Sequence, residues 1–208
     1  MIRLVNARNI PDHTPLLRAM HEDRKRVFVD LLKWDIPHDG EIEADQFDGA
    51  GAEYLILQDK ATGAHLASLR LLRTERPHLM SEVFADLCAG GVPCGPDIRE
   101  ITRFCVAPRG RASERRLARN MLVRAMVEYG LLTGIRSFTA ACDIGFLSEV
   151  LSAGWDCRPL GPPRGDGRSL VGALRIDIGP STLAMLVGSW SCDPVELRLA
   201  EYEPALAA

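Results

Sequence analysis

No apolar run in this chain approaches the roughly 20 residues that a helix needs to cross a bilayer. The N-terminal residues, MIRLVNARNIPDHT, lack the apolar core of a secretory signal peptide. The six cysteines are scattered and form no C-x-x-C pair, which argues against a disulfide framework and a cysteine-ligated metal. A formal net charge of −3 argues against general nucleic-acid binding. We therefore expect a cytoplasmic protein with reduced cysteines, without bound metal, and without a nucleic-acid or membrane partner.

The composition is that of one globular domain spanning residues 1–208, with 47% hydrophobic and 25% charged residues. Apolar periodicity and turn residues predict helices at 15–33, 81–88, 113–132, 144–153 and 180–190, and strands at 53–59, 65–73, 98–106, 137–141 and 168–178. Ser81 and Ser113 are the expected N-caps, and Pro37 is expected to prevent the first helix from continuing. This order predicts an α/β (α+β) fold, a mixed and mostly antiparallel sheet flanked by helices. It is similar to the acyltransferase fold of the GNAT superfamily.

The stretch from Arg24 to Asp48 combines Arg24, the large aromatic residues Phe28 and Trp34, and an acidic loop. Phe28 follows Arg24 by four residues, so a helix would place both on one face. Trp34 stands beside the loop, and a tryptophan face attracts cations. The loop carboxylates are Asp35, Asp39, Glu41, Glu43, Asp45 and Asp48. The pattern predicts a pocket for a small cationic ligand; the alternative is a core Phe28, a solvated Arg24 and a solvated acidic loop.

Three charged residues interrupt the apolar strands. Arg70 lies between leucines and would need a partner if it is buried, or it faces water on an edge strand. Glu100 and Arg103 have opposite parity, so an unbroken strand would point them to opposite faces. If both serve one site, the strand must carry a bulge near Thr102. The alternative is that one of them faces the interior and the other faces solvent.

A basic segment follows the strand at 98–106. Its residues include Arg109, Arg111, Arg115 and Arg116, at the start of the predicted helix. A helix N-terminus presents free N–H groups that suit a phosphate. The loop Arg109-Gly110-Arg111-Ala112 matches the Gln/Arg-x-x-Gly-x-Gly/Ala pattern of GNAT enzymes only in part. The segment therefore suits the single phosphate of an acidic carrier protein at least as well as coenzyme A, or else is a solvated helix face.

Nine residues in order give the chain a family signature: Arg24, Phe28, Trp34, Asp45, Asp48, Arg70, Phe84, Glu100 and Arg103. All of them except Phe84 lie in the stretches RKRVFVDLLKW, DQFD, LRLLRT and EITRF. In order and spacing they resemble the acyl-homoserine-lactone synthases, the LuxI-type autoinducer synthases of quorum sensing. The resemblance covers about half of the chain and is less specific beyond Ala107.

The resemblance implies an acyltransferase that acylates the amine of S-adenosyl-L-methionine from an acyl thioester, then closes the lactone and expels methylthioadenosine. Adenosylmethionine is a substrate here, and no cofactor is implied. The donor would be an acyl-carrier protein or acyl-CoA. Two other activities stay open: a GNAT-type N-acyltransferase that forms no lactone, and a non-catalytic module that binds carrier protein.

The resemblance also implies roles for residues. Glu100 would be the base, in a charged cluster with Arg70 and Arg103. The adenosylmethionine side would be shaped by Arg24, Phe28, Trp34, Asp45 and Asp48. The acyl chain would meet Phe84, Thr102 and Thr139, where a threonine at position 139 is typical of members that prefer 3-oxo chains. The carrier or its phosphate would meet Arg109, Arg111, Arg115 and Arg116.

Overall fold

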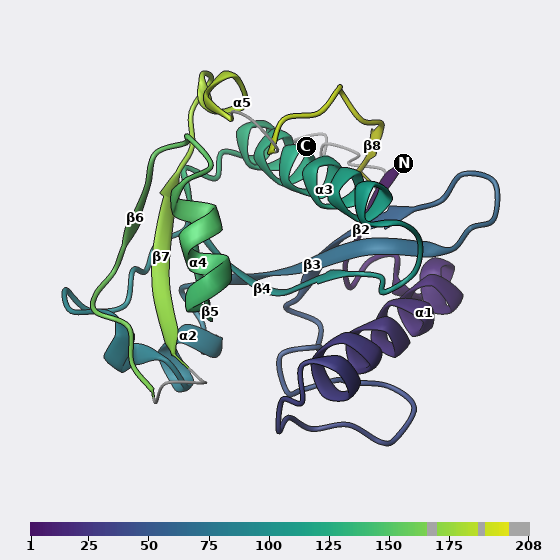
Figure 1. Ribbon diagram of the computed structural model, residues 1–208, viewed down its shortest axis with the longest axis horizontal. Coiled ribbons are helices and arrows are strands. Elements are labelled where there is room, and N and C mark those ends of the chain that lie inside the picture. Colours follow the sequence, from purple (N-terminus) through teal and green to yellow (C-terminus); the bar gives the residue numbers. More distant parts are fainter. Residues whose placement is uncertain (166–169, 187–189, 200–208) are drawn as a thin grey trace, which may run out of the picture.

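A single eight-stranded sheet runs through the protein (Figure 1). The computed structural model describes residues 1–165, 170–186 and 190–199. The strand order is β6-β7-β5-β4-β3-β2-β1-β8, with β4–β5 and β1–β8 parallel and the other neighbours antiparallel. The strands are β1 (Ile2–Val5), β2 (Glu53–Gln58), β3 (His65–Arg73), β4 (Ile98–Val106), β5 (Ser137–Asp143), β6 (Cys157–Pro159), β7 (Val171–Asp177) and β8 (Leu197–Arg198). The predicted mixed, mostly antiparallel sheet flanked by helices is confirmed.

Helices cover both faces of the sheet because the central strands are apolar on both sides. Helix α3 (Ala112–Thr133) packs on one face, over leucines such as Leu55 and Leu69. Helix α1 (Thr14–Arg24) packs on the other, over Tyr54 and Leu72. Figure 1 shows the two helices on opposite sides of β3 and β4. None of the helices in the described ranges has the length and apolarity of a membrane span.

The sheet opens between β4 and β5. Parallel pairing joins only Ile98–Glu100 to Ser137–Thr139, so the rest of β4 has no ladder partner on that side in the described structure. The other side of β4 pairs with β3, but the register shifts between Ser68 and Arg70. These two interruptions leave the second half of β4 available to a ligand.

Helix α1 continues without a break into a π-helical segment, labelled η2 (Lys25–Leu31). The helix ends there, well before Pro37, so the prediction that proline ends it is wrong. The cause is a left-handed cap: Lys33 has φ +59°, and the Trp34 N–H donates to the Phe28 carbonyl at 2.9 Å. Segments of π-helix occur frequently at functional sites.

The predicted helix at 81–88 is two short ones, α2 (Leu79–Glu82) and η3 (Ala85–Leu87). Ser81 is inside α2, and its hydroxyl accepts the His78 N–H at 3.0 Å. Ser113 is inside α3, which has Arg111 at its N-cap position. Neither serine is therefore an N-cap. The predicted caps are wrong because α2 begins two residues before Ser81 and α3 begins one residue before Ser113.

The C-terminal elements are α4 (Ile144–Leu151), β7 and α5 (Thr182–Met185). Asp143 caps α4 by accepting the N–H groups of Gly145 and Phe146. The predicted strand at 168–178 corresponds to β7, and its residues 168–169 lie outside the described residues. The predicted helix at 180–190 is confined to α5 where it is described, and residues 187–189 lie outside. Strands β1, β6 and β8 were not predicted.

Candidate active site

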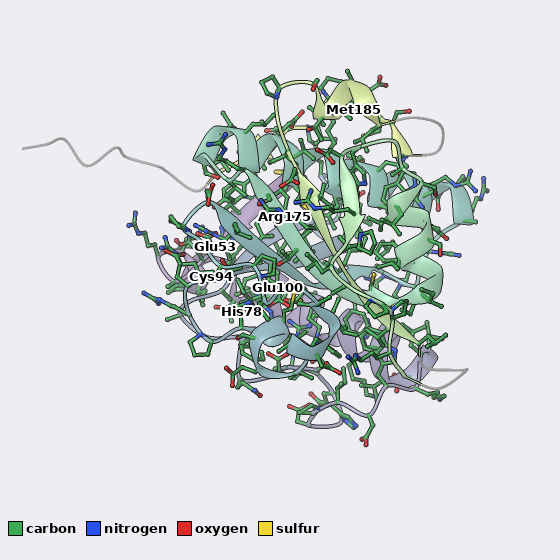
Figure 2. The ribbon with its side chains drawn as sticks, turned by 90° about the vertical axis from the view of Figure 1, so that its left-hand side faces the viewer. Glu53, His78, Cys94, Glu100, Arg175 and Met185 are labelled. Carbon is green, nitrogen blue, oxygen red and sulfur yellow. The ribbon has the colours of Figure 1, made fainter. Side chains whose placement is uncertain are left out.

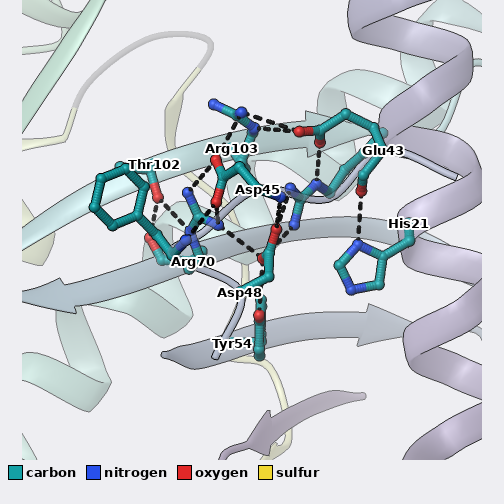
Figure 3. Close-up of polar contacts among 10 residues, drawn as sticks. His21, Glu43, Asp45, Asp48, Tyr54, Arg70, Thr102 and Arg103 are labelled. Atoms are coloured by element: carbon teal, nitrogen blue, oxygen red, sulfur yellow. Dashed lines mark hydrogen bonds and ion pairs between the residues drawn. The ribbon is translucent and has the colours of Figure 1, made fainter. Parts of the chain in front are cut away.

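Three buried arginines meet on the α1 face of the sheet. Arg24 comes from the last turn of α1, Arg70 from the middle of β3, and Arg103 from β4. All three reach the loop between η2 and β2. Figure 3 shows Arg70 and Arg103 beside the carboxylates of this loop. Arg24 and Arg70 are fully buried, so the alternatives of a solvated Arg24 and of an edge-strand Arg70 are wrong.

Arg24 is held by two carboxylates of the loop. Its Nε lies 2.6 Å from Glu43 Oε2, and its Nη1 and Nη2 each lie 2.8 Å from an oxygen of Asp48. The second contact is bidentate, the geometry in which an arginine fork binds a carboxylate most strongly. Asp48 also accepts the Tyr54 hydroxyl at 2.8 Å. The end of the acidic loop is therefore fixed to both α1 and β2.

Arg70 and Arg103 hold the middle of the loop against the sheet. Arg70 Nη1 and Nη2 lie 2.6 and 3.0 Å from the Asp45 oxygens, and Nη1 lies 2.7 Å from Asp48 Oδ1. Arg103 Nη2 lies 2.8 Å from Asp45 Oδ2 and 2.9 Å from Glu43 Oε1. Three arginines thus face three carboxylates, and the cluster is electrically balanced.

The two aspartates of this cluster are ionised. Burial opposes ionisation of Asp48, but the Arg24 and Arg70 charges outweigh burial and hold its pKa well below the ordinary range. Asp45 shows the same balance with Arg70 and Arg103, and its pKa is also lowered. Neither aspartate can therefore accept a proton near neutral pH. Their contribution is to hold the loop.

Glu43 is the member of this cluster that sequence reasoning did not single out. It is fully buried and bridges Arg24 to Arg103. In the sequence it is one of six similar loop carboxylates, and only the fold distinguishes it. His21 is a second such residue: its Nδ1 lies 2.8 Å from the Glu43 carbonyl oxygen.

Arg103 reaches this face because β4 carries a bulge. Arg70 pairs with Thr102 and Ser68 with Cys105, so two residues of β4 oppose one of β3. Arg103 itself has φ +50°, a conformation that costs a non-glycine residue energy. The predicted bulge near Thr102 is confirmed. It places Arg103 on the face that Thr102 already occupies.

Phe28 and Trp34 form a stacked pair beside the cluster. Their ring centroids lie 4.8 Å apart with an interplanar angle of 10°. Arg103 Cζ lies 5.9 Å from the Phe28 centroid. Phe28 is buried, whereas Trp34 is 39% exposed. The pair therefore presents an aromatic surface to solvent at the edge of the acidic loop.

Glu100 differs from the other buried carboxylates. It is 0% exposed, and neither carboxylate oxygen has a hydrogen-bond partner among the described residues. Burial raises its pKa to about 7, and the nearby Met80 and Leu79 N–H groups and the Arg70 charge only partly oppose this. Figure 2 labels Glu100 in a view from the side of the β6–β7 edge. A buried carboxyl of this kind can exchange a proton near neutral pH.

The three predicted acyl-chain residues lie at different depths around Glu100. Thr139 pairs with Glu100 across the β4–β5 junction, and its buried hydroxyl has no partner within the described structure. The Thr102 hydroxyl accepts Arg70 Nε at 2.9 Å. Phe84 packs in a small apolar cluster with Met80. Of the three, Thr139 alone has a hydroxyl without a hydrogen-bond partner among the described residues.

The four predicted carrier or phosphate arginines fall into two groups. Arg111, Arg115 and Arg116 are exposed at the start of α3. Arg109 is instead bonded to Asp23 of α1. An open groove of about 440 Å³ lies beside them, lined by Val27, Leu31, Val106, Pro108, Arg115, Arg116 and Arg119. In the described ranges, no group of three or more His, Cys, Asp or Glu side chains has the arrangement of a metal site.

Comparison with known proteins gives the family. The model of the autoinducer synthase family matches residues 9–184, which is most of the chain. The chain belongs to the autoinducer synthase family. The acyl-homoserine-lactone synthase of Pseudomonas aeruginosa is 30% identical over 189 residues, 89% of this chain and 92% of that protein. The enzyme of Ralstonia nicotianae is 33% identical over 174 residues, 81% and 85% of the two chains.

Solved structures agree with this assignment. The CoA-dependent acyl-homoserine lactone synthase MesI superposes with a TM-score of 0.83 at 27% identity, covering 95% of this chain and 98% of MesI. BjaI, solved with SAM and isopentyl-CoA, gives the same score and identity over 96% and 92% of the two chains. The predicted family, the GNAT-like fold and the acyltransferase class of this autoinducer synthase are confirmed.

Proposed function

We propose that this autoinducer synthase makes N-acyl-L-homoserine lactone from S-adenosyl-L-methionine and an acyl thioester. The relatives that cover most of its length are acyl-homoserine-lactone synthases, and BjaI has also been solved with MTA. One structural observation carries the assignment of chemistry. Glu43, Asp45 and Asp48 all form ion pairs with arginines, whereas the Glu100 carboxyl forms no ion pair with any described residue. Glu100 is thus the carboxylate of this site that can act as a base.

The first step is acyl transfer. Glu100, directly or through a water molecule, takes a proton from the α-ammonium of adenosylmethionine. The amine nitrogen then forms a bond to the thioester carbon, the C–S bond breaks, and the leaving thiolate takes the second proton from nitrogen. A backbone N–H of the segment 101–104 stabilises the oxyanion, because the bulge at Arg103 removes part of β4 from the regular ladder.

The second step is lactone closure. A carboxylate oxygen of the methionyl group forms a bond to its own γ-carbon, and the bond from that carbon to the sulfonium sulfur breaks. Sulfur keeps the electron pair, so neutral methylthioadenosine leaves. No proton needs to move, and the demand on the protein is positioning. Phe28 and Trp34, beside the loop that Arg24, Asp45 and Asp48 fix, provide an aromatic surface for the sulfonium substrate.

The donor we propose is an acyl-CoA. MesI and BjaI, which resemble this chain over nearly its whole length, are CoA-dependent enzymes. The groove beside Arg115 and Arg116 is small and has apolar walls, which suits a pantetheine arm and phosphates. An acyl-carrier protein is the second candidate, favoured by the exposed arginines at the start of α3. The acyl chain would pass Thr139 and Phe84, and no cofactor takes part.

The test is a purified-enzyme assay with adenosylmethionine and matched sets of acyl-CoA and acyl-carrier donors. We expect lactone and methylthioadenosine in equal amounts, measured by mass spectrometry, with the higher kcat/KM for acyl-CoA. Acylated amine without methylthioadenosine would identify an N-acyltransferase that forms no lactone. No turnover with any donor, together with binding of carrier protein, would identify a non-catalytic module.

A further inference from the structure

A second buried charge cluster lies beside the first, centred on Asp23. This residue is fully buried in α1, directly before Arg24. Its Oδ1 lies 2.6 Å from Arg109 Nη1 and 2.8 Å from Arg26 Nη1. Its Oδ2 lies 2.5 Å from Arg109 Nη2 and 2.7 Å from His65 Nδ1. The Asp23–Arg109 contact is therefore bidentate and fixes direction as well as distance.

Arg109 belongs to the short loop between β4 and α3. Besides Asp23, its Nη2 donates to the His65 carbonyl at 3.1 Å, so the guanidinium is anchored to both α1 and β3. The side chain is 49% exposed, which leaves one side of it at the surface. The sequence suggested a phosphate contact for this arginine. Its contacts with Asp23 and His65 tie the loop to α1 and β3.

The groove lies between the two segments that this pair joins. One wall is Val27 and Leu31, which follow Asp23 on η2. The other wall includes Val106 and Pro108, which directly precede Arg109. The Asp23–Arg109 contact thus links the two segments that carry these walls. No other ion pair within the described residues joins η2 or α1 to the β4–α3 loop.

Asp23 also stands next to the residue that fixes the acidic loop. Arg24 bonds to Glu43 and Asp48, while Asp23 bonds to Arg109. Consecutive helical residues point about 100° apart. Asp23 therefore reaches the loop beside the groove, while Arg24 reaches the acidic loop. The π-helical segment begins at the very next residue, Lys25.

We propose that Asp23 is a positioning residue that sets the width of the acyl-donor groove by holding Arg109, and that Arg109 acts through this contact. The proposal rests on the proposed function, because it assigns the groove to the donor. It predicts a defect that is selective for one substrate. Loss of Asp23 should disturb the donor groove, whereas adenosylmethionine still meets a loop held by Arg24, Arg70 and Arg103.

The test compares Asp23→Asn with Glu22→Gln. Glu22 is the neighbouring carboxylate; it pairs with Arg18 and Arg26 and makes no ion pair with the loop. In Asp23→Asn we expect the KM for acyl donor and the Kd for coenzyme A, from calorimetry, to rise at least tenfold. The KM for adenosylmethionine should change less than threefold. Glu22→Gln should leave all three constants within twofold. An unchanged donor KM in Asp23→Asn would overturn the proposal.

A double-mutant cycle separates holding from direct phosphate binding. If Arg109 acts through Asp23, the Asp23→Asn/Arg109→Ala double variant has a donor KM no worse than the poorer single variant. If the increases in donor KM of the two single variants multiply in the double variant, Arg109 contacts the donor itself, which contradicts the proposal. If Asp23→Asn does not fold, Arg109→Lys keeps the charge and loses the bidentate contact. An unchanged donor KM in Arg109→Lys would also refute it. Failure of the proposed function is distinct, because the unmodified protein would then make no lactone.

Discussion

Three carboxylates of the acidic loop and one of β4 lie on the α1 face of the sheet, and they differ in what neutralises them. Glu43, Asp45 and Asp48 each contact at least two arginine side chains or one in a bidentate manner. Glu100 lies on the same face as Thr102, two residues away on β4, yet bonds to none of these arginines. Asp45 and Asp48 are held in the charged state by their arginines. Glu100 keeps the capacity to change its protonation.

Replacing Glu100 by Gln should abolish amide formation while the protein stays folded. The amide is nearly isosteric but cannot accept the substrate proton, so kcat should fall at least a hundredfold. In the unmodified enzyme kcat/KM should fall below about pH 7, the pKa of the Glu100 carboxyl. The measurement is a pH series of methylthioadenosine release, with Glu82→Gln on exposed α2 as control. Full activity of Glu100→Gln would remove this residue as the base.

The same residue should make stability depend on pH. Its pKa is raised from 4.5 to about 7, so the folded state binds more protons than the unfolded state in this interval. The free energy of unfolding should therefore fall as pH rises from about 4.5 to 7, by about 3 kcal/mol. Urea unfolding at several pH values measures this. The slope should disappear in Glu100→Gln, and an unchanged slope would place its origin elsewhere.

At the residue scale, the sequence predicted which charged residues belong to the site better than it predicted which of them contact one another. Arg70 stood in an apolar strand and needed a partner, and the parity of Glu100 and Arg103 required a bulge; both inferences hold. Glu43 was not distinguished because its neighbours in the loop are also carboxylates. Its selection depends on Arg24 and Arg103, which are 19 and 60 residues away along the chain.

At the scale of elements, the acidic loop behaves as part of the sheet because of its ion pairs. Glu43→Gln should leave Arg24 and Arg103 short of a buried partner, and breaking such a pair costs about 3 kcal/mol. We expect that loss in urea unfolding, with a KM for adenosylmethionine at least tenfold higher. Glu41→Gln, in the same loop but 74% exposed, is the matched control and should change stability by less than about 0.5 kcal/mol. Equal effects in the two variants would show that Glu43 does not order the loop.

The long strands were the elements best predicted from sequence. Residues 65–73 and 98–106 were predicted with the bounds of β3 and β4, since both combine apolar side chains with clear turn residues at their ends. Helix ends were predicted less well. The first helix stops through the left-handed Lys33, which carries no compositional signal, and β1, β6 and β8 are too short to show periodicity.

At the scale of the whole molecule, a net charge of −3 conceals an uneven distribution. Acidic residues are concentrated in the loop that the sheet neutralises, while Arg115 and Arg116 stay exposed at the start of α3. Reversing both to Glu should raise the KM for the acyl donor, and more strongly at low salt because less screening leaves the repulsion intact. The measurement is donor KM at 20 to 500 mM salt. A donor KM that does not change would place the docking surface elsewhere.

Element order was sufficient to predict the mixed sheet and the GNAT-like arrangement, because hairpins and strand–helix–strand units leave few ways to connect them. The groove was not predictable in the same way. Its walls come from η2 and from the end of β4, and the pair that joins them, Asp23 and Arg109, is separated by 86 residues. No local pattern marks two residues so far apart as partners.

This pair also limits how the enzyme can be recombined with its relatives. A chimaera that joins residues 1–107 to the second half of another synthase would inherit Asp23 but not Arg109. Its carboxylate would then be buried against His65 and Arg26 alone. A crossover placed after Gly110 would transfer both partners together. The natural boundary for exchanging acyl specificity therefore lies in the loop between β4 and α3, after Gly110 and before α3 begins at Ala112.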